Sequence, residues 1–372
     1  MNKKIIILVF SLLICGVAGK AFANSDLNTH NSEAIALKYY YEGIELVKLD
    51  KFEEALEAFD LAVKYKPDYA EAYYCKGVVL KKLDKFEEAI QAYDLAIKYK
   101  SDYAEAYSNK GNALIHLNKF DEAIKVLNLA IKYKPDLAEA YYNKGVALDN
   151  LSKFEEAIKA YDLAIKYKPV LAEAYYDKGV ALDNLNKFEE AIQAYDLAIK
   201  YKPNYAEAYS NKGNALIDLN KFEEAIPAFD LAIKHKPDDA NAYYNKGLAL
   251  GNLSRFEEAI QAYDLAIKHK PDDANAYYNK GLALGNLSRF DEAIKAYDLA
   301  IKYKPDYAEA YYCKGVVLKK FSRFEEAIQA YDLAIKHKPD LVQAYCNKSL
   351  ALKALNKDKE AEEVFNKAES FK

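Results

Sequence analysis

Pairs of acidic residues are the first groups in this sequence that could do chemistry. Glu155 and Glu156 are adjacent, and two neighbouring carboxyl groups can serve as a general acid and a general base. Equivalent acidic pairs recur every 34 residues, each in the first turn of a predicted helix, where negative charge favours the helix dipole. Helix capping therefore explains these pairs better than catalysis does.

The histidines do not predict a catalytic or metal site either. Beyond the N-terminal region they are His116, His235, His269 and His337. Each lies in a different 34-residue unit, and three of them replace a tyrosine near the end of a predicted helix, which favours a solvated position. Motifs such as H-E-x-x-H, G-x-S-x-G or a P-loop are absent from the sequence. We therefore predict a non-enzymatic protein with no cofactor and no metal site.

Tyrosine and asparagine are better candidates, for binding rather than catalysis. Tyrosine offers contact area and a hydroxyl group, and asparagine can pair with a peptide backbone. On a helical wheel both residue types fall on one face, opposite the predicted core stripe. The expected binding residues are Tyr74, Tyr142, Asn143, Tyr176, Asn211, Tyr244, Asn245, Tyr278, Asn279 and Tyr312. Alternatively, recent duplication has copied these residues without selection for binding.

A 34-residue repeat positions all of these side chains. Glycine recurs at this interval from Gly43 to Gly315, and Ser349 holds the tenth position. Tyrosine stands four residues before each of these positions, and proline closes most of the units. A period of this length predicts a stacked array of small units, because no single unit can bury its apolar faces alone.

Each repeat is predicted to form two helices joined by a short turn. In the fourth repeat, Tyr141, Gly145 and Leu148 share one face of the first helix by their i, i+4, i+7 spacing. A second apolar stripe of the same period follows the turn. Ser152 is expected to be the N-cap of the second helix, and Pro169 ends the pair. Gly145 has no side chain, which lets the two helices approach closely.

The recurring residues resemble the motif of the tetratricopeptide repeat family. In the fourth repeat they are Tyr141, Lys144, Gly145, Leu148, Ala157, Tyr161, Ala164 and Pro169. The resemblance implies an all-α, right-handed superhelical solenoid of ten antiparallel helix pairs over residues 36–372, whose first helices line a concave groove. Tyrosine replaces the family's tryptophan, and lysine replaces its leucine in nine repeats. The lysine stem is then expected to pack while its ammonium group reaches solvent.

The two ends of the sequence differ from the repeats. Residues 1–23 combine a basic start, an apolar run and an A-x-A sequence, which predicts a cleaved secretory signal peptide. Residues 24–35 form a polar N-terminal segment, and we expect its first part to be loose. The last repeat is shortened, and Asp358, Glu362 and Glu369 are expected to give it a polar cap.

Charge and the predicted fold together limit the classes of function that the protein can have. The net charge of −4, with acids and bases interspersed, provides no basic patch for nucleic acid. After cleavage no stable membrane span remains, so we expect an exported protein, periplasmic or secreted. We predict a scaffold that binds a protein partner, as a peptide or a helix, in the concave groove. The alternative is a structural or self-assembling rod, favoured by an apolar outer surface on the first repeat at Leu37, Tyr41, Ile44 and Val47.

Overall fold

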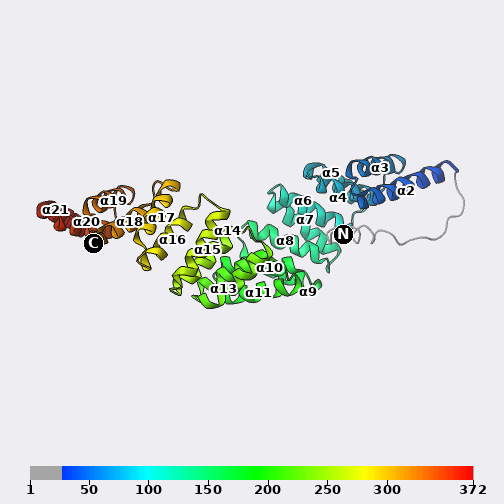
Figure 1. Ribbon diagram of the computed structural model, residues 1–372. Helices are drawn as coiled ribbons and strands as arrows, with labels where there is room; N and C mark the ends of the chain where they lie inside the picture. Colours follow the sequence, from blue (N-terminus) through cyan, green and yellow to red (C-terminus); the bar gives the residue numbers. More distant parts are fainter. Residues whose placement is uncertain (1–26, 372) are drawn as a thin grey trace. The chain divides into compact units, whose positions relative to one another are not determined.

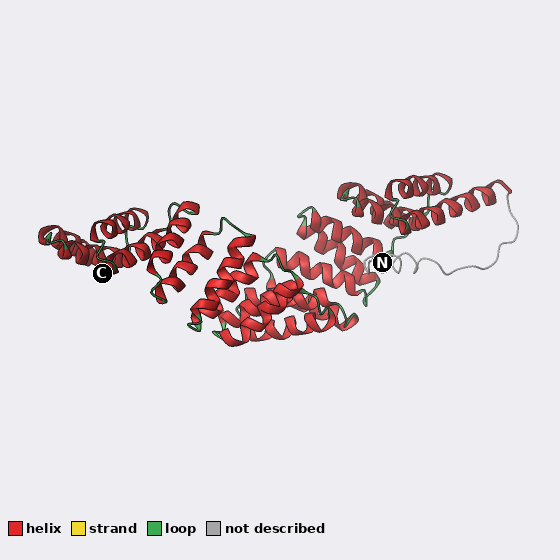
Figure 2. Cartoon of the chain, viewed as in Figure 1, coloured by secondary structure: helices red, strands yellow, loops and turns green. Residues whose placement is uncertain are grey.

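Every regular element in residues 27–371 is an α-helix, as Figures 1 and 2 show for this computed structural model, which describes those residues. The predicted signal peptide at residues 1–23 lies outside the described part of the chain. No helix within residues 27–371 has the length and apolar character that crossing a bilayer requires.

The chain divides into two compact units, with the boundary between Lys187 and Phe188. The helices of the first unit are α2 (Leu27–Lys48), α3 (Phe52–Tyr65), α4 (Ala70–Lys82), α5 (Phe86–Tyr99), α6 (Ala104–His116), α7 (Phe120–Tyr133), α8 (Ala138–Asn150), α9 (Phe154–Tyr167) and α10 (Ala172–Asn184). Those of the second unit are α11 (Phe188–Tyr201), α12 (Ala206–Asp218), α13 (Phe222–His235), α14 (Ala240–Asn252), α15 (Phe256–His269), α16 (Ala274–Asn286), α17 (Phe290–Tyr303), α18 (Ala308–Lys320), α19 (Phe324–His337), α20 (Val342–Ala354) and α21 (Asp358–Glu369). Within each unit, antiparallel helix pairs stack in chain order, which confirms the predicted all-α solenoid fold there.

Repeats are numbered here from the one that begins at residue 36, and a position is counted from the first residue of its repeat. The glycine at position 8 is required by the contact between the two helices of a pair. A Cβ atom on Gly77 would lie 2.6 Å from Cε1 of Tyr93, and one on Gly111 would lie 2.5 Å from Cγ of Leu127. Tyr93 and Leu127 are fully buried, so neither has room to move away. The close helix approach predicted from this glycine is therefore confirmed.

The turn inside each repeat differs from the sequence prediction. Ser152 does not cap α9; the N-cap is Lys153, whose side chain makes no capping hydrogen bond. Ser152 instead has a φ of 58°, and its N–H donates to the carbonyl of Asp149 at 2.8 Å, which closes the C-terminal end of α8. A short polar residue occupies this left-handed position in every repeat, because Asn, Asp and Ser tolerate it better than branched side chains do. These residues are Asp50, Asp84, Asn118, Ser152, Asn186, Asn220, Ser254, Ser288, Ser322 and Asn356.

The lysine at position 7 is paired rather than simply solvated. Lys110 lies 2.5 Å from a carboxylate oxygen of Asp94, and Lys178 lies 2.6 Å from one of Asp162, each in the preceding second helix. The same pair links the neighbouring repeats at most other boundaries within the units. The lysine that departs from the family pattern therefore ties one repeat to the next.

The N-terminal helix is longer than the repeat pattern predicts. α2 begins at Leu27, so the expectation of a loose segment is wrong from this residue onward. Two of the residues expected on the outer surface, Ile44 and Val47, are buried in the core with 9% and 3% exposure. Leu37 and Tyr41 are exposed, at 46% and 53%. Half of the predicted apolar surface therefore belongs to the core between α2 and its neighbours.

Two helices of the second unit have features set by single residues. α13 runs without interruption from Phe222 to His235, although it contains Pro227. In the last repeat, Asp358, Glu362 and Glu369 are exposed on α21, as predicted for its polar face.

Candidate functional site

The predicted tyrosine and asparagine rows lie on the first helices, where they join neighbouring repeats. The carboxamide nitrogen of Asn279 donates to the hydroxyl of Tyr244 at 3.0 Å, across the step from repeat 7 to repeat 8. The same contact joins Asn109 to Tyr74 and Asn347 to Tyr312, each at 3.2 Å. Position 6 of one repeat therefore holds the hydroxyl at position 5 of the repeat before it.

The tyrosine rings of this row pack against the core. The ring of Tyr142 lies 6.1 Å from that of Tyr161, and the ring of Tyr244 lies 6.0 Å from that of Tyr263, in tilted contacts within one repeat. Tyr74 is only 2% exposed. These tyrosines therefore contribute to helix packing, and their hydroxyl groups are engaged within the chain rather than free for a ligand.

Sequence reasoning missed the residue at position 12, which faces the asparagine of the next repeat. The Lys81 ammonium donates to the Oδ1 atoms of Asn109 and Asn112, at 2.8 and 3.2 Å. Lys319 makes the first of these contacts with Asn347, at 2.5 Å. Asn109 also donates to Tyr74 and to the carbonyl of Glu105, so its carboxamide group is fully engaged. Where position 12 is lysine, the asparagine row is closed to a ligand.

Aspartates take these places in repeats 4 and 5. The Tyr142 hydroxyl donates to Oδ2 of Asp177 at 2.8 Å, in the place of the usual asparagine. The pKa of Asp177 is raised to about 6, mainly by burial and also by the nearby charges of Asp149 and Glu173, while the Tyr142 hydrogen bond lowers it. Burial also raises the pKa of Asp149, at position 12. This part of the row is acidic and half-buried.

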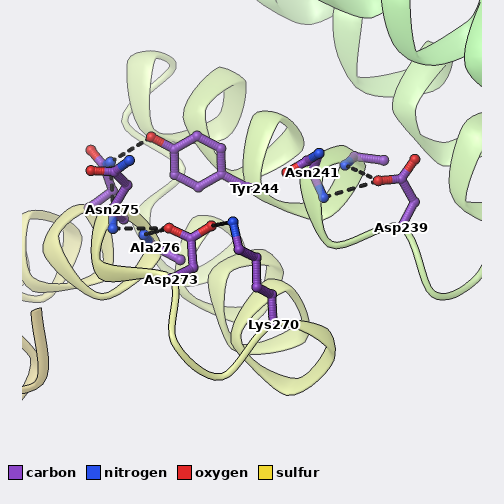
Figure 3. A network of polar contacts seen from close by, with 9 residues as sticks. Asp239, Asn241, Tyr244, Lys270, Asp273, Asn275 and Ala276 are labelled. Atoms are coloured by element: carbon purple, nitrogen blue, oxygen red, sulfur yellow. Dashed lines mark hydrogen bonds and ion pairs between the residues drawn. The ribbon is translucent and has the colours of Figure 1, made fainter. Parts of the chain in front are cut away.

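In repeats 7 and 8 the row is neutral and open. Gly251 occupies position 12, so no side chain reaches Asn279 from that direction. Asn279 uses its nitrogen twice, toward Tyr244 and toward the carbonyl of Asn275 at 3.0 Å, and no residue in the described chain donates to its Oδ1. Figure 3 shows Tyr244 and Asn275 in this network, next to Asp273. Asn279 is therefore held in place with its acceptor oxygen unused.

Among the first helices whose N-cap residue is described, those of repeats 7 and 8 have side-chain N-caps. Asp239 accepts hydrogen bonds from the N–H groups of Asn241 and Ala242, at 3.1 and 3.2 Å. Asp273 does the same for the next repeat, and Lys270 lies 3.4 Å from its carboxylate (Figure 3). These caps fix the N-terminal turns of α14 and α16, which begin the open segment.

In each unit, a second kind of asparagine contact joins two first helices. The nitrogen of Asn112 donates to Oδ1 of Asn143 at 3.1 Å, and the nitrogen of Asn245 donates to Oδ1 of Asn214 at 2.8 Å. Asn112 and Asn214 stand at position 9, where the other repeats have an apolar residue. Two of the predicted binding residues, Asn143 and Asn245, are therefore oriented by a second amide.

A small pocket opens between repeats 8 and 9. Its volume is about 230 Å³. The residues that line it are Leu282, Gly285, Asn286, Phe290, Tyr297, Tyr312, Cys313, Val316, Val317 and Lys320. Of the predicted binding residues, Tyr312 borders this pocket, and Tyr278 lies next to it, with its hydroxyl 3.8 Å from the Cys313 sulfur.

The histidines lie away from this row. His235, His269 and His337 each stack on a tyrosine at the start of the same repeat, with ring centroids 5.6–5.7 Å apart. His116 stacks on Phe86 at 4.5 Å. Within residues 27–371 no three His, Cys, Asp or Glu side chains are grouped so that they could hold a metal ion. His235, His269 and His337 therefore act as stacking residues in the places where other repeats use tyrosine.

Comparison with known proteins agrees with this architecture. Two tetratricopeptide repeat families match residues 142–208, 210–274 and 278–342, and residues 43–84, 80–116 and 111–152. A third match to the repeat covers residues 342–372. The chain belongs to the tetratricopeptide repeat family. Among curated proteins, none matches the sequence.

Two solved structures with TM-scores above 0.5 show the same fold. The C-terminal part of a TPR repeat-containing protein from Cytophaga hutchinsonii has 19% sequence identity and a TM-score of 0.57, over 64% of this chain and 98% of that one. PilF of Pseudomonas aeruginosa has 17% identity and a TM-score of 0.51, over 57% and 96%. YrrB, described as a TPR protein with an unusual peptide-binding site, has 26% identity and a TM-score of 0.46, over 50% and 96%.

Proposed function

We propose that this chain is a non-enzymatic scaffold that binds an extended peptide segment of a partner protein along its first helices. Tetratricopeptide repeats generally form non-catalytic interaction scaffolds with protein or peptide partners, and the chain belongs to that family. The finer statement concerns where the peptide binds. The open segment of repeats 7 and 8, around Asn279, is the place that its chemistry favours.

The observation that carries this proposal is the unused Oδ1 of Asn279. The side chain is fixed by two hydrogen bonds of 3.0 Å, to Tyr244 and to its own helix, so little side-chain entropy remains to be lost on binding. An extended peptide presents backbone N–H groups that need acceptors once water is excluded. Asn109 and Asn347 have the same two contacts, but lysine occupies their oxygens. Position 12 thus decides which step of the row can accept a peptide.

Selection from a library of random twelve-residue peptides displayed on phage tests this function. We expect wild-type protein to enrich a family of peptides whose binding slows amide hydrogen exchange in α14, α16 and α18. The second helices α15 and α17 are expected to change less. Protection confined to the second helices, or no enrichment above a protein-free surface, would contradict the proposal.

Self-assembly is the second candidate, and one observation favours it. Leu37 and Tyr41 are both exposed on α2, in a stack whose other first helices are covered on this side by a preceding repeat. Sedimentation velocity separates the two functions. Growth of the sedimentation coefficient with concentration, removed by Leu37→Ser with Tyr41→Ser, would favour assembly, and a constant monomer value would argue against it.

We also propose that the protein is exported, and that its partner is therefore met outside the cytoplasm, in the periplasm or beyond. The support is the sequence of residues 1–23, with Lys3 and Lys4 before an apolar run and Ala21 and Ala23 at the A-x-A spacing.

A further inference from the structure

Two first helices of the chain have the same sequence but different surroundings. The first helices of repeats 2 and 9, α4 and α18, both read AEAYYCKGVVLKK. Position 12 of the preceding repeat faces each of these helices. It is Val47 for α4 and Gly285 for α18, which are 238 residues apart. The two surroundings also differ at Ile44 and Leu282, at Lys48 and Asn286, and at Phe59 and Tyr297. Position 12 is where one of them has a side chain and the other has none.

Val47 fills the space beside α4. It is 3% exposed, and Cys75 and Val78, which lie in the same core cluster, are 1% and 4% exposed. The equivalent residues Cys313 and Val316 remain partly exposed, and both line the pocket of about 230 Å³. A Cβ atom on Gly285 would have the Tyr297 hydroxyl oxygen, at 4.0 Å, as its nearest neighbour, so the space above this glycine is open. The absence of a side chain at Gly285 therefore leaves open part of the space that forms the pocket.

The lining of the pocket has two chemical parts. Its walls include Leu282, Phe290, Val316 and Val317, which are apolar. Lys320 is exposed, and its ammonium lies 5.3 Å from the centroid of the Phe290 ring, with no carboxylate paired to it in the described residues. The volume is below the roughly 300–1,000 Å³ typical of sites that hold a whole small molecule. A single apolar side chain beside a negative charge fits both the size and the chemistry.

We propose that this pocket binds the apolar side chain of a leucine, isoleucine or methionine in an extended peptide, and that an adjacent aspartate or glutamate of the peptide pairs with Lys320. This inference rests on the proposed function, and it adds a specificity to it. The apolar side chain leaves water for the space beside Leu282 and Phe290. The carboxylate gains an ammonium group that has no acidic partner among residues 27–371, in a setting partly desolvated by the peptide itself.

The peptides selected by wild-type protein provide the probe. We expect them to share an apolar residue next to an acidic one. Gly285→Val should weaken their binding at least tenfold, because it fills the pocket as Val47 fills the equivalent space, and replacement of a helical glycine by valine does not threaten the helix. Lys320→Gln should weaken binding about threefold to tenfold. Lys82→Gln makes the same change on the identical helix without a pocket and should leave binding within twofold.

Alkylation of the cysteines tests the pocket without any peptide. Cys313 should react faster than Cys75 in wild-type protein, and Gly285→Val should slow Cys313 while Cys346 keeps its rate. Bound peptide should protect Cys313 in the same way.

The outcomes separate the two proposals. Selected peptides that bind Gly285→Val as tightly as wild type, or that lack the apolar–acidic pair, would overturn the pocket assignment and leave the scaffold function standing. A Cys313 rate unchanged by Gly285→Val would also overturn the pocket. Failure of wild-type protein to select any peptide would overturn the proposed function and this inference with it.

Discussion

The Lys81 ammonium donates to the carboxamide oxygen of Asn109 at 2.8 Å, across the step between repeats 2 and 3. Burial of this lysine lowers its pKa from 10.5 to about 8, although Asn112 also accepts from it. A charged group is thus kept in a mostly buried place by neutral partners alone. The contact closes one step of the asparagine row, and it makes the stability of that step depend on pH.

Stability should therefore rise as pH increases from about 8 toward 10. Between those values the unfolded chain still holds the lysine proton, whereas the folded chain has released it, so the energetic cost of burying the charge disappears. The shift corresponds to on the order of 3 kcal/mol over the full range. Urea unfolding at pH 7.5 and pH 9.5 measures this rise in the free energy of unfolding. We expect Lys81→Met to lose the rise, and Lys82→Met, at an exposed residue, to keep it. An equal pH response in Lys81→Met and wild type would contradict this reading.

Asp177 should make stability fall, rather than rise, as the pH increases. Its pKa of about 6 lies above the ordinary 3.8, so the folded chain holds this proton where the unfolded chain has lost it. The stabilisation is complete below about pH 4 and is lost as pH rises through 6. Asp177→Asn keeps an acceptor for the Tyr142 hydroxyl and should raise stability at pH 7 by roughly 2–3 kcal/mol. Thermal melts of both proteins at pH 4 and pH 7 give the comparison; a variant no more stable than wild type at pH 7 would refute the raised pKa.

Two glycines four residues apart on α14 should respond in opposite ways to alanine. A Cβ atom on Gly247 would lie 2.5 Å from Cε1 of Tyr263, whereas one on Gly251 would meet nothing closer than the Tyr263 hydroxyl at 3.7 Å. Gly247→Ala should cost about 1–3 kcal/mol through overpacking. Gly251→Ala should stabilise by about 0.5–1 kcal/mol, because alanine favours the helix. Denaturant melts of the pair decide it, and a similar effect of both substitutions would exclude the close contact as the cause.

Cleavage of the signal peptide is expected after Ala23. The A-x-A spacing of Ala21 and Ala23 sets this site. N-terminal sequencing of protein recovered outside the cytoplasm should begin at Asn24. Recovery of a chain that retains Met1 would contradict export by this route.

The sequence was sufficient for the repeat and for the close contact at its glycine. Glycine recurs every 34 residues from Gly43 to Gly315, with tyrosine four residues earlier. Each repeat contains two apolar stripes, and the helical spacing of their residues predicts a pair of helices. The turn was harder, because Ser152 favours both an N-cap and a left-handed residue, and the backbone hydrogen bond to Asp149 decides between them.

The candidate site was predicted only in part. Helical spacing placed Tyr244 and Asn279 on the correct face, but it did not show that they bond to each other. Their contact, and that of Lys81 with Asn109, join residues 35 and 28 apart, so the geometry of stacking decides them. The sequence does contain a signal for the importance of position 12. This position reads Lys, Ile, Asp, Asp, Ile, Gly, Gly and Lys from repeat 2 to repeat 9, while the positions around it vary little.

Binding of a selected peptide to Asn279→Ala and Asn109→Ala tests the central claim most directly. Both variants remove the same two contacts, to a tyrosine hydroxyl and to a carbonyl of the same helix, but of the two residues Asn279 is the one with an unused oxygen. One lost hydrogen bond corresponds to roughly 0.5–1.5 kcal/mol, so Asn279→Ala should weaken binding about threefold to tenfold in calorimetry. Asn109→Ala should stay within twofold of wild type. Equal losses in the two variants, or no loss in Asn279→Ala, would contradict the assignment of the peptide to the open segment.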